Sequence, residues 1–132
     1  VGHVDGDTIK VRIWGPLPEG LNENETIRLI GVDTPETVHP SKPVEAFGKE
    51  ASDYTREKLF GKTVYLAFDW DLRDRYGRLL AYIYTGHEAC HNADLIEEGY
   101  AFAYTSYAFQ FLDEFRELEK IARENKTGLW NE

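Results

Sequence analysis

The sequence predicts an α+β fold in which a small antiparallel β-barrel carries packed helices. Short runs that alternate apolar and polar residues, typical of half-buried strands, come early in the chain. Runs with helical spacing of apolar residues are concentrated later, and no regular strand–helix–strand alternation connects them. With 132 residues, the chain has the length of one domain, so residues 1–132 are expected to fold as a single unit.

The first two strands are expected to form a hairpin. Residues 7–14 place an apolar side chain at every second position, which indicates a strand with one buried face. Residues 15–25 contain two prolines and two glycines and therefore predict a loop. Residues 26–32 predict the returning strand. Few residues precede this hairpin, so we expect the first strand of the barrel to be short.

A loop, a helix and two strands are expected next. Residues 33–43 contain three prolines and no apolar period, which predicts an irregular loop. Residues 44–60 have an apolar stripe at helical spacing, and Gly61 is expected to end that helix. Residues 62–68 and 78–84 then predict two further strands.

Two helices are expected to complete the fold. Residues 90–98 predict a short helix that ends at Gly99, and residues 109–125 predict a longer one. Gly128 is expected to end the longer helix, and Trp130 to pack back onto the core.

Composition narrows the possible functions. The net charge of −9 argues against a protein that holds nucleic acid through a general positive field. Any such substrate would have to be held by a few local arginines and a metal ion. The longest uncharged stretches are too short to span a bilayer, so no membrane partner is expected. The single cysteine excludes an internal disulfide.

Four charged side chains point to phosphodiester chemistry. Asp7 and Asp33 are hard oxygen ligands, and Arg28 and Arg78 provide guanidinium groups that can bind a phosphate through two hydrogen bonds. Together they suit a divalent cation and a phosphate at one site. Taken singly, each has a plainer interpretation: an aspartate at a strand end usually caps a turn, and an arginine usually forms a surface ion pair.

Longer blocks of sequence carry a resemblance. They are Val4-Asp5-Gly6-Asp7-Thr8, residues 28–37 (RLIGVDTPET), residues 74–82 (DRYGRLLAY), Asn92 with residues 95–101 (LIEEGYA), the spaced pair Tyr104 and Tyr107, and Gly128-Leu129-Trp130. In these blocks, which run in the family's order and cover nearly the whole chain, the sequence resembles the staphylococcal nuclease (thermonuclease) family. The resemblance implies a five-stranded OB-fold β-barrel with three packed α-helices, here with a truncated first strand.

The resemblance also implies a role for each candidate residue. Its catalytic residues are Arg28, Glu36 and Arg78; its metal ligands are Asp7, Asp33 and the backbone carbonyl of Thr34; its substrate-binding residues are Arg75, Tyr76, Tyr104 and Tyr107. The implied cofactor is Ca²⁺, which takes six to eight oxygen ligands, so waters must complete the shell. His39 is an alternative base to Glu36, although an ordinary loop histidine is the favoured interpretation.

The implied function is calcium-dependent hydrolysis of DNA and RNA with little sequence specificity. Cleavage of the 5′ P–O bond would leave 3′-phosphate ends, and the protein is expected to be a monomer that is secreted after removal of a signal segment. Two alternatives remain open. One is a catalytically inactive module that binds nucleic acid or protein, and the other is a structural barrel that binds calcium for stability.

Overall fold

The computed structural model describes residues 1–3, 5–35, 48–86 and 89–131. The expected loop over residues 33–43 and the start of the helix expected from residue 44 fall largely outside this part, as do Glu36 and His39. The described elements are β1 (Gly2–His3), β2 (Thr8–Arg12), β3 (Asn24–Leu29), β4 (Val32–Asp33), α1 (Gly48–Leu59), β5 (Tyr65–Ala67), β6 (Leu79–Tyr84), α2 (His91–Glu97), β7 (Phe102–Ala103), α3 (Leu112–Glu124) and the 3₁₀ helix η1 (Gly128–Trp130). The α+β class and, within the described part, the three α-helices are as predicted.

One mixed sheet has the strand order β1-β2-β3-β6-β5. The predicted hairpin is confirmed, because β2 and β3 pair antiparallel with Thr8 opposite Arg28. The expectation of a purely antiparallel barrel is wrong, because β3 and β6 run parallel, with Ile27 opposite Leu79. A parallel pair needs a long crossover connection, and the chain between these strands contains α1.

The strand predicted over residues 26–32 is divided in two. β3 ends at Leu29, and β4 pairs with β7 in a separate two-stranded ribbon. Gly31 explains the break: its φ is +77°, and a Cβ there would lie 2.6 Å from the ring of Phe109. The apolar, β-type residues continue through this point, but the backbone turns at the glycine. Asp33 therefore lies on a different element from Arg28.

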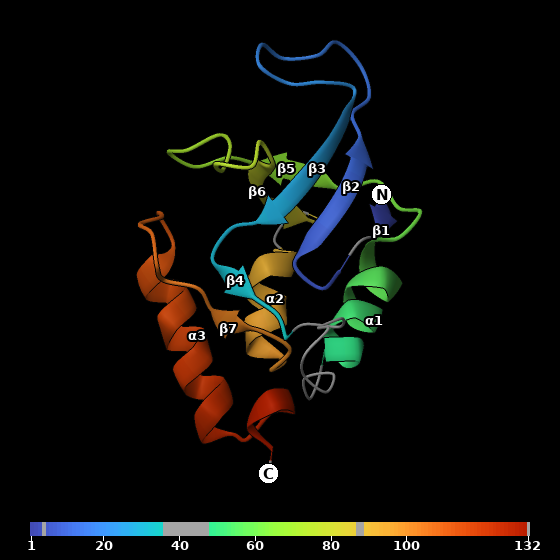
Figure 1. Cartoon of the computed structure of the whole chain (residues 1–132). Helices are drawn as coiled ribbons and strands as arrows, with labels where there is room; N and C mark the ends of the chain where they lie inside the picture. Colours follow the sequence, from blue (N-terminus) through green and yellow to red (C-terminus); the bar gives the residue numbers. More distant parts are fainter. Residues whose placement is uncertain (4, 36–47, 87–88, 132) are drawn as a thin grey trace.

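Glycines end the first two helices as predicted. Gly61 follows α1 with a φ of +73°, and Gly99 follows α2 with a φ of +78°. The strand predicted over residues 62–68 is shorter than expected, covering only Tyr65–Ala67. Figure 1 shows the sheet at one end of the molecule and the three helices at the other, with the β4–β7 ribbon beside α3 and in front of α2.

The last helix ends within one residue of the predicted position, but Gly128 is not the residue that ends it. Lys126, with a φ of +53°, reverses the chain, and the backbone N–H of Thr127 donates to the carbonyl of Ala122. This is a Schellman-type end with a lysine in the place usually taken by glycine. Gly128 instead lets two segments approach closely, because a Cβ there would lie 2.4 Å from the carbonyl oxygen of Gly99.

The core joins the sheet to the helices. Its fully buried side chains include Ile9, Ile27, Leu29, Leu79, Ile83, Leu95 and Ile96. Trp130, expected to pack onto the core, is half-buried and packs edge-on against half-buried Phe102, with ring centroids 5.4 Å apart. None of the helices in the described residues combines the length and apolar character needed to cross a membrane.

Candidate active site

Arg28, on β3, is the centre of the candidate site. Its Nη1 donates to the carbonyls of Leu29, at 3.0 Å, and Val32, at 2.7 Å. The side chain therefore wraps around the turn that Gly31 creates, and only 16% of it is exposed. These two bonds leave the position of the guanidinium well defined.

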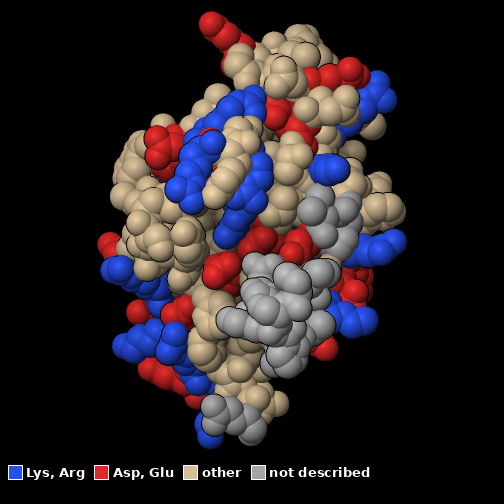
Figure 2. Space-filling view, in the orientation of Figure 1, with Lys and Arg blue, Asp and Glu red and all other residues tan. Residues whose placement is uncertain are grey.

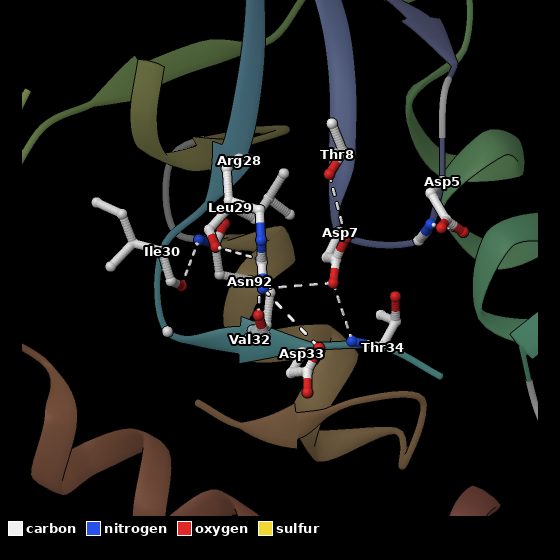
Figure 3. Close-up of polar contacts among 12 residues, drawn as sticks. Asp5, Asp7, Thr8, Arg28, Leu29, Ile30, Val32, Asp33, Thr34 and Asn92 are labelled. Atoms are coloured by element: carbon white, nitrogen blue, oxygen red, sulfur yellow. Dashed lines mark hydrogen bonds and ion pairs between the residues drawn. The ribbon is translucent and has the colours of Figure 1, made fainter. Parts of the chain in front are cut away.

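Two carboxylates from other elements meet this guanidinium. Nη2 of Arg28 lies 3.5 Å from Oδ2 of Asp7, just before β2, and 3.9 Å from Oδ1 of Asp33, on β4. The backbone N–H of Thr34 donates to Oδ2 of Asp7 at 3.1 Å, which ties the two elements together. Figure 3 shows the side chains of Asp7 and Asp33 approaching the same end of the Arg28 head group, with Asp5 set apart from them. The guanidinium of Arg28 therefore bridges two acidic residues that are 26 positions apart in the sequence.

Beside this group is a hollow of about 480 Å³. The residues that line it are Arg28, Asp33, Asp74, Arg75, Tyr76, Arg78, Tyr104 and Tyr107. Seven of these eight are residues that the sequence singled out, and they come from β3, β4, the turn before β6 and the segment after β7. Asp7 is outside this described lining and reaches the site through Arg28.

Asp74 orients the second arginine. Its Oδ1 accepts hydrogen bonds from the backbone N–H groups of Tyr76 and Arg78, both at 2.9 Å. Its Oδ2 accepts a 2.7 Å hydrogen bond from Nε of Arg78. Gly77, with a φ of +82°, closes the turn. The turn thus presents Arg78 to the hollow with one edge of its guanidinium already held.

Aromatic rings form the rest of the wall. Tyr76 is 69% exposed, and the guanidinium carbons of Arg75 and Arg78 lie 5.0 and 5.5 Å from its ring centroid. On the other side, the ring of Tyr104 lies 5.8 Å from the guanidinium carbon of Arg28. The hydroxyl of Tyr107 accepts a hydrogen bond from the backbone N–H of Gly31, and burial raises the pKa of this hydroxyl. The site offers exposed rings beside cationic groups.

The structure therefore brings nearly all of the sequence-predicted residues to one place. Asp7, Arg28, Asp33 and Thr34 form one contact group, and the hollow joins it to Arg75, Tyr76, Arg78, Tyr104 and Tyr107. Glu36 lies outside the described residues. In Figure 2 several basic side chains gather on one face, directly beside acidic ones. The chemical roles of these residues remain predictions.

The donor atoms present suit a hard cation. Asp7 and Asp33 supply carboxylate oxygens, and the hydroxyl of Thr34 is buried without a hydrogen-bond partner among the described residues. A Cβ at Gly6 would lie 2.8 Å from that hydroxyl oxygen, so only glycine leaves it room. The described residues contain no group of three His, Cys, Asp or Glu side chains arranged to hold a metal. A calcium ion here would therefore need backbone and water oxygens as well.

Sequence reasoning did not single out three supporting contacts. Asp74 had a local signal, because an aspartate before a Tyr-Gly turn commonly caps it. Arg73 and Glu25 form a double hydrogen bond, at 2.9 and 2.6 Å, across 48 positions of sequence. Buried Thr55 and His91 contact each other behind the Asp5–Asp7 turn. The last two pairs had no local signal, since each joins segments that only the fold brings together.

Comparison with known proteins identifies the family that this chain resembles over most of its length. Residues 26–132 match the family model described as "Staphylococcal nuclease homologue". The thermonuclease of Staphylococcus hyicus is 41% identical over 131 residues, which cover 97% of this chain and 72% of that protein. The thermonuclease of Staphylococcus intermedius is 38% identical over 96% of this chain and 71% of its own length. Endonuclease YncB of Bacillus subtilis is 36% identical over 97% of this chain and 58% of its own length.

Proposed function

The chain belongs to the staphylococcal nuclease family, and from that premise we propose that it is a calcium-dependent nuclease. Its substrates are DNA and RNA, which it cleaves with little sequence specificity. The proposal is supported by the thermonuclease and endonuclease relatives and, above all, by one observation: Arg28, Asp33 and Arg78 line a single hollow. The alternative of an inactive binding module is not favoured, because such a module has no need to keep these residues together.

In this proposal the two arginines bind the scissile phosphate. Guanidinium groups can each donate two hydrogen bonds to phosphate oxygens, and they stabilise the added negative charge of the transition state. Arg28 is held by two backbone carbonyls, and Arg78 by Asp74. Because both side chains are already oriented, little conformational entropy is lost when the phosphate arrives.

The metal would be held by Asp7, Asp33 and the carbonyl of Thr34. When bound, calcium would act as a Lewis acid that polarises a phosphate oxygen. The oxygen-only donor set supports a hard cation. Arg28 forms ion pairs with both carboxylates and balances only one of their two negative charges, so the group keeps a net negative charge that favours a cation.

Glu36 follows Asp33 by three residues and is proposed to orient the attacking water or to accept its proton. The water oxygen forms a new bond to phosphorus on the side opposite the 5′ oxygen. The P–O5′ bond breaks as the 5′ oxygen leaves and takes up a proton. The products are a 3′-phosphate end and a 5′-hydroxyl end.

The tyrosines are proposed to bind the nucleotides around the scissile phosphate. Tyr76, Tyr104 and Tyr107 line the hollow, and Arg75 lies beside Tyr76. Stacking of bases on aromatic rings tolerates any base, which suits an enzyme with little sequence preference. Family membership further supports an OB-fold closure of the sheet, one domain over residues 1–132, a secreted monomer and no membrane partner.

Digestion of a supercoiled plasmid tests the proposal directly. The protein should degrade the plasmid with calcium, and activity should disappear with a chelator. Glu36→Gln should lower the rate by about 10²–10⁴-fold. Glu57→Gln, an exposed substitution on α1, is the matched control and should behave like the parent. Polynucleotide kinase should label the new 5′ ends without prior phosphatase treatment.

The other outcomes distinguish the alternatives. DNA that is retarded on the gel but remains intact would support the binding module. Calcium that raises the melting temperature without any effect on DNA would support the structural barrel. Equal activity with magnesium would contradict the calcium requirement while leaving the nuclease assignment in place.

A further inference from the structure

A buried polar pair lies behind the turn that carries Asp7. Thr55, on α1, and His91, the first residue of α2, are 0% and 1% exposed. The hydroxyl oxygen of Thr55 lies 2.7 Å from the carbonyl oxygen of Gly6 and 3.0 Å from Nε2 of His91. A histidine and a hydroxyl thus meet one backbone carbonyl where apolar packing would otherwise be expected.

The direction of these hydrogen bonds follows from the atoms involved. The carbonyl of Gly6 can only accept, so the single hydroxyl proton of Thr55 is used there. Nε2 of His91 must then carry a proton and donate it to the hydroxyl oxygen. Burial, with a smaller contribution from the charge of Lys58, lowers the pKa of His91 to about 4. The ring is therefore neutral near pH 7, with its proton on Nε2.

The carbonyl held in this way belongs to the residue next to a proposed metal ligand. Gly6 directly precedes Asp7, and its backbone N–H donates to Oδ1 of Asp5 at 2.8 Å. The Cα of Gly6 faces the side chain of Thr34, whose backbone N–H donates to Asp7. Gly6 therefore contacts both Thr34 and Thr55, so a shift of Gly6 would change the position of Asp7 relative to Asp33.

We propose that Thr55 and His91 are positioning residues for the cation site. The hydrogen bonds from His91 to Thr55 and from Thr55 to Gly6 hold the Asp5–Asp7 turn at the separation from β4 that a shared cation requires. This inference rests on the proposed function, because it takes Asp7 and Asp33 as ligands of one ion. Neither residue touches substrate or metal; they act only through the backbone of Gly6.

Calcium binding, measured by titration calorimetry without nucleic acid, tests the inference. Thr55→Val keeps the shape of the side chain and removes the hydroxyl, so calcium affinity should fall by about 10–100-fold, as for other outer contacts of metal ligands. Thr55→Ser restores the hydroxyl and should restore affinity. His91→Phe keeps a ring against Tyr54 but cannot donate, whereas His91→Gln can. The Gln variant should bind calcium more tightly than the Phe variant.

Two measurements separate positioning from general stability. Ile96→Val removes one methylene from a fully buried residue of α2 that lies outside this hydrogen-bond chain, and its calcium affinity should match the parent's. Nitrogen-15 NMR of the parent should show His91 protonated on Nε2. If Nε2 is found unprotonated, the hydrogen-bond chain does not exist and the inference is wrong, even if Thr55→Val fails to fold.

The measurements distinguish failure of the positioning role from failure of the proposed nuclease function. If the parent binds calcium and Thr55→Val loses no more affinity than Ile96→Val, positioning by this pair is refuted and the proposed function stands. If the parent binds no calcium at all, the metal-dependent function fails, and the positioning role fails with it.

Discussion

The guanidinium of Arg28 lies 3.5 Å from the carboxylate of Asp7, and the same nitrogen also faces Asp33. A single arginine therefore has partners of three kinds: two acids, two backbone carbonyls and, in the proposed mechanism, a phosphate. This position makes Arg28 the strongest test of the site, because it links the metal ligands to the substrate.

Arg28→Lys should lower the cleavage rate by about 10²–10³-fold. Lysine keeps the positive charge but has one compact ammonium, which cannot hold the carbonyls of Leu29 and Val32 while it binds phosphate through two hydrogen bonds. The rate at saturating calcium measures the effect. Arg116→Lys, on the exposed surface of α3, is the control and should leave the rate unchanged. A similar rate for the two variants would argue against a catalytic Arg28.

Tyr76→Ala should weaken binding of a single-stranded oligonucleotide. A base that stacks on an aromatic ring contributes about 1–3 kcal/mol, so the dissociation constant should rise by about 5–150-fold. Tyr76→Phe keeps the ring and loses only the 2.9 Å contact with Arg75, so it should bind nearly as well as the parent. Fluorescence anisotropy in a Glu36→Gln background, where cleavage is suppressed, gives both constants. An equal loss of affinity in Tyr76→Ala and Tyr76→Phe would show that the hydroxyl, rather than the ring, binds the strand.

Glu25→Gln should destabilise the fold more than removal of any exposed ion pair. The Glu25 side chain is only 5% exposed and accepts two hydrogen bonds from Arg73, which also donates to the carbonyls of Gly20 and Gly77. Glu23→Gln breaks the exposed pair with Arg12 and should cost below about 1 kcal/mol. Thermal denaturation measures the melting temperature of both variants. Equal melting temperatures would refute the prediction that Glu25→Gln is the more destabilising.

The same ion pair has a predictable pH dependence. The hydrogen bond from Arg73 lowers the pKa of Glu25 below the unfolded value of 4.5. The pair therefore stabilises the fold fully above that value, and the contribution is lost as the pH falls through the lower, folded pKa.

Asn92→Asp should cost about 3–5 kcal/mol of folding free energy. Asn92 is fully buried; its amide nitrogen donates to the carbonyls of Ile30 and Ala81, and its oxygen accepts from the N–H of Ile83. An aspartate would place a charge in the core and could donate to neither carbonyl. Urea denaturation at pH 7 measures the loss, and Asn131→Asp on the exposed surface should change stability little. A loss as small as the control's would show that the core accommodates the charge.

Protonation of buried His91 should lower the free energy of unfolding in mild acid. Its pKa is about 4 in the folded chain and 6.5 in the unfolded chain, so the unfolded state binds the proton first as the pH falls. The stability given by neutral His91 is complete above pH 6.5 and is lost between about pH 6.5 and 4, at a cost of about 3 kcal/mol. Urea denaturation across this pH range should show that the free energy of unfolding falls more steeply for the parent than for His91→Gln. Parallel curves would contradict the shifted pKa.

Local patterns anticipated much of the fold. Alternation predicted the β2–β3 hairpin, and the glycines after α1 and α2 predicted where those helices end. Prediction failed at Gly31, where β-type residues continue through a break in the strand, and at Lys126, which ends α3 in place of the expected Gly128. In both places distant packing decided the outcome: Gly31 lies against Phe109, and Gly128 lies against Gly99.

The sequence by itself determined which kinds of chemistry the chain carries: two acids, two arginines and a set of tyrosines, in blocks that resemble one nuclease family. Only the tertiary structure decided that one guanidinium bridges Asp7 and Asp33, and that His91 and Thr55 lie behind Gly6. The reason is physical. Periodicity and turn chemistry reflect interactions within a few residues, whereas these contacts depend on the parallel pairing of β3 with β6 and on helix packing.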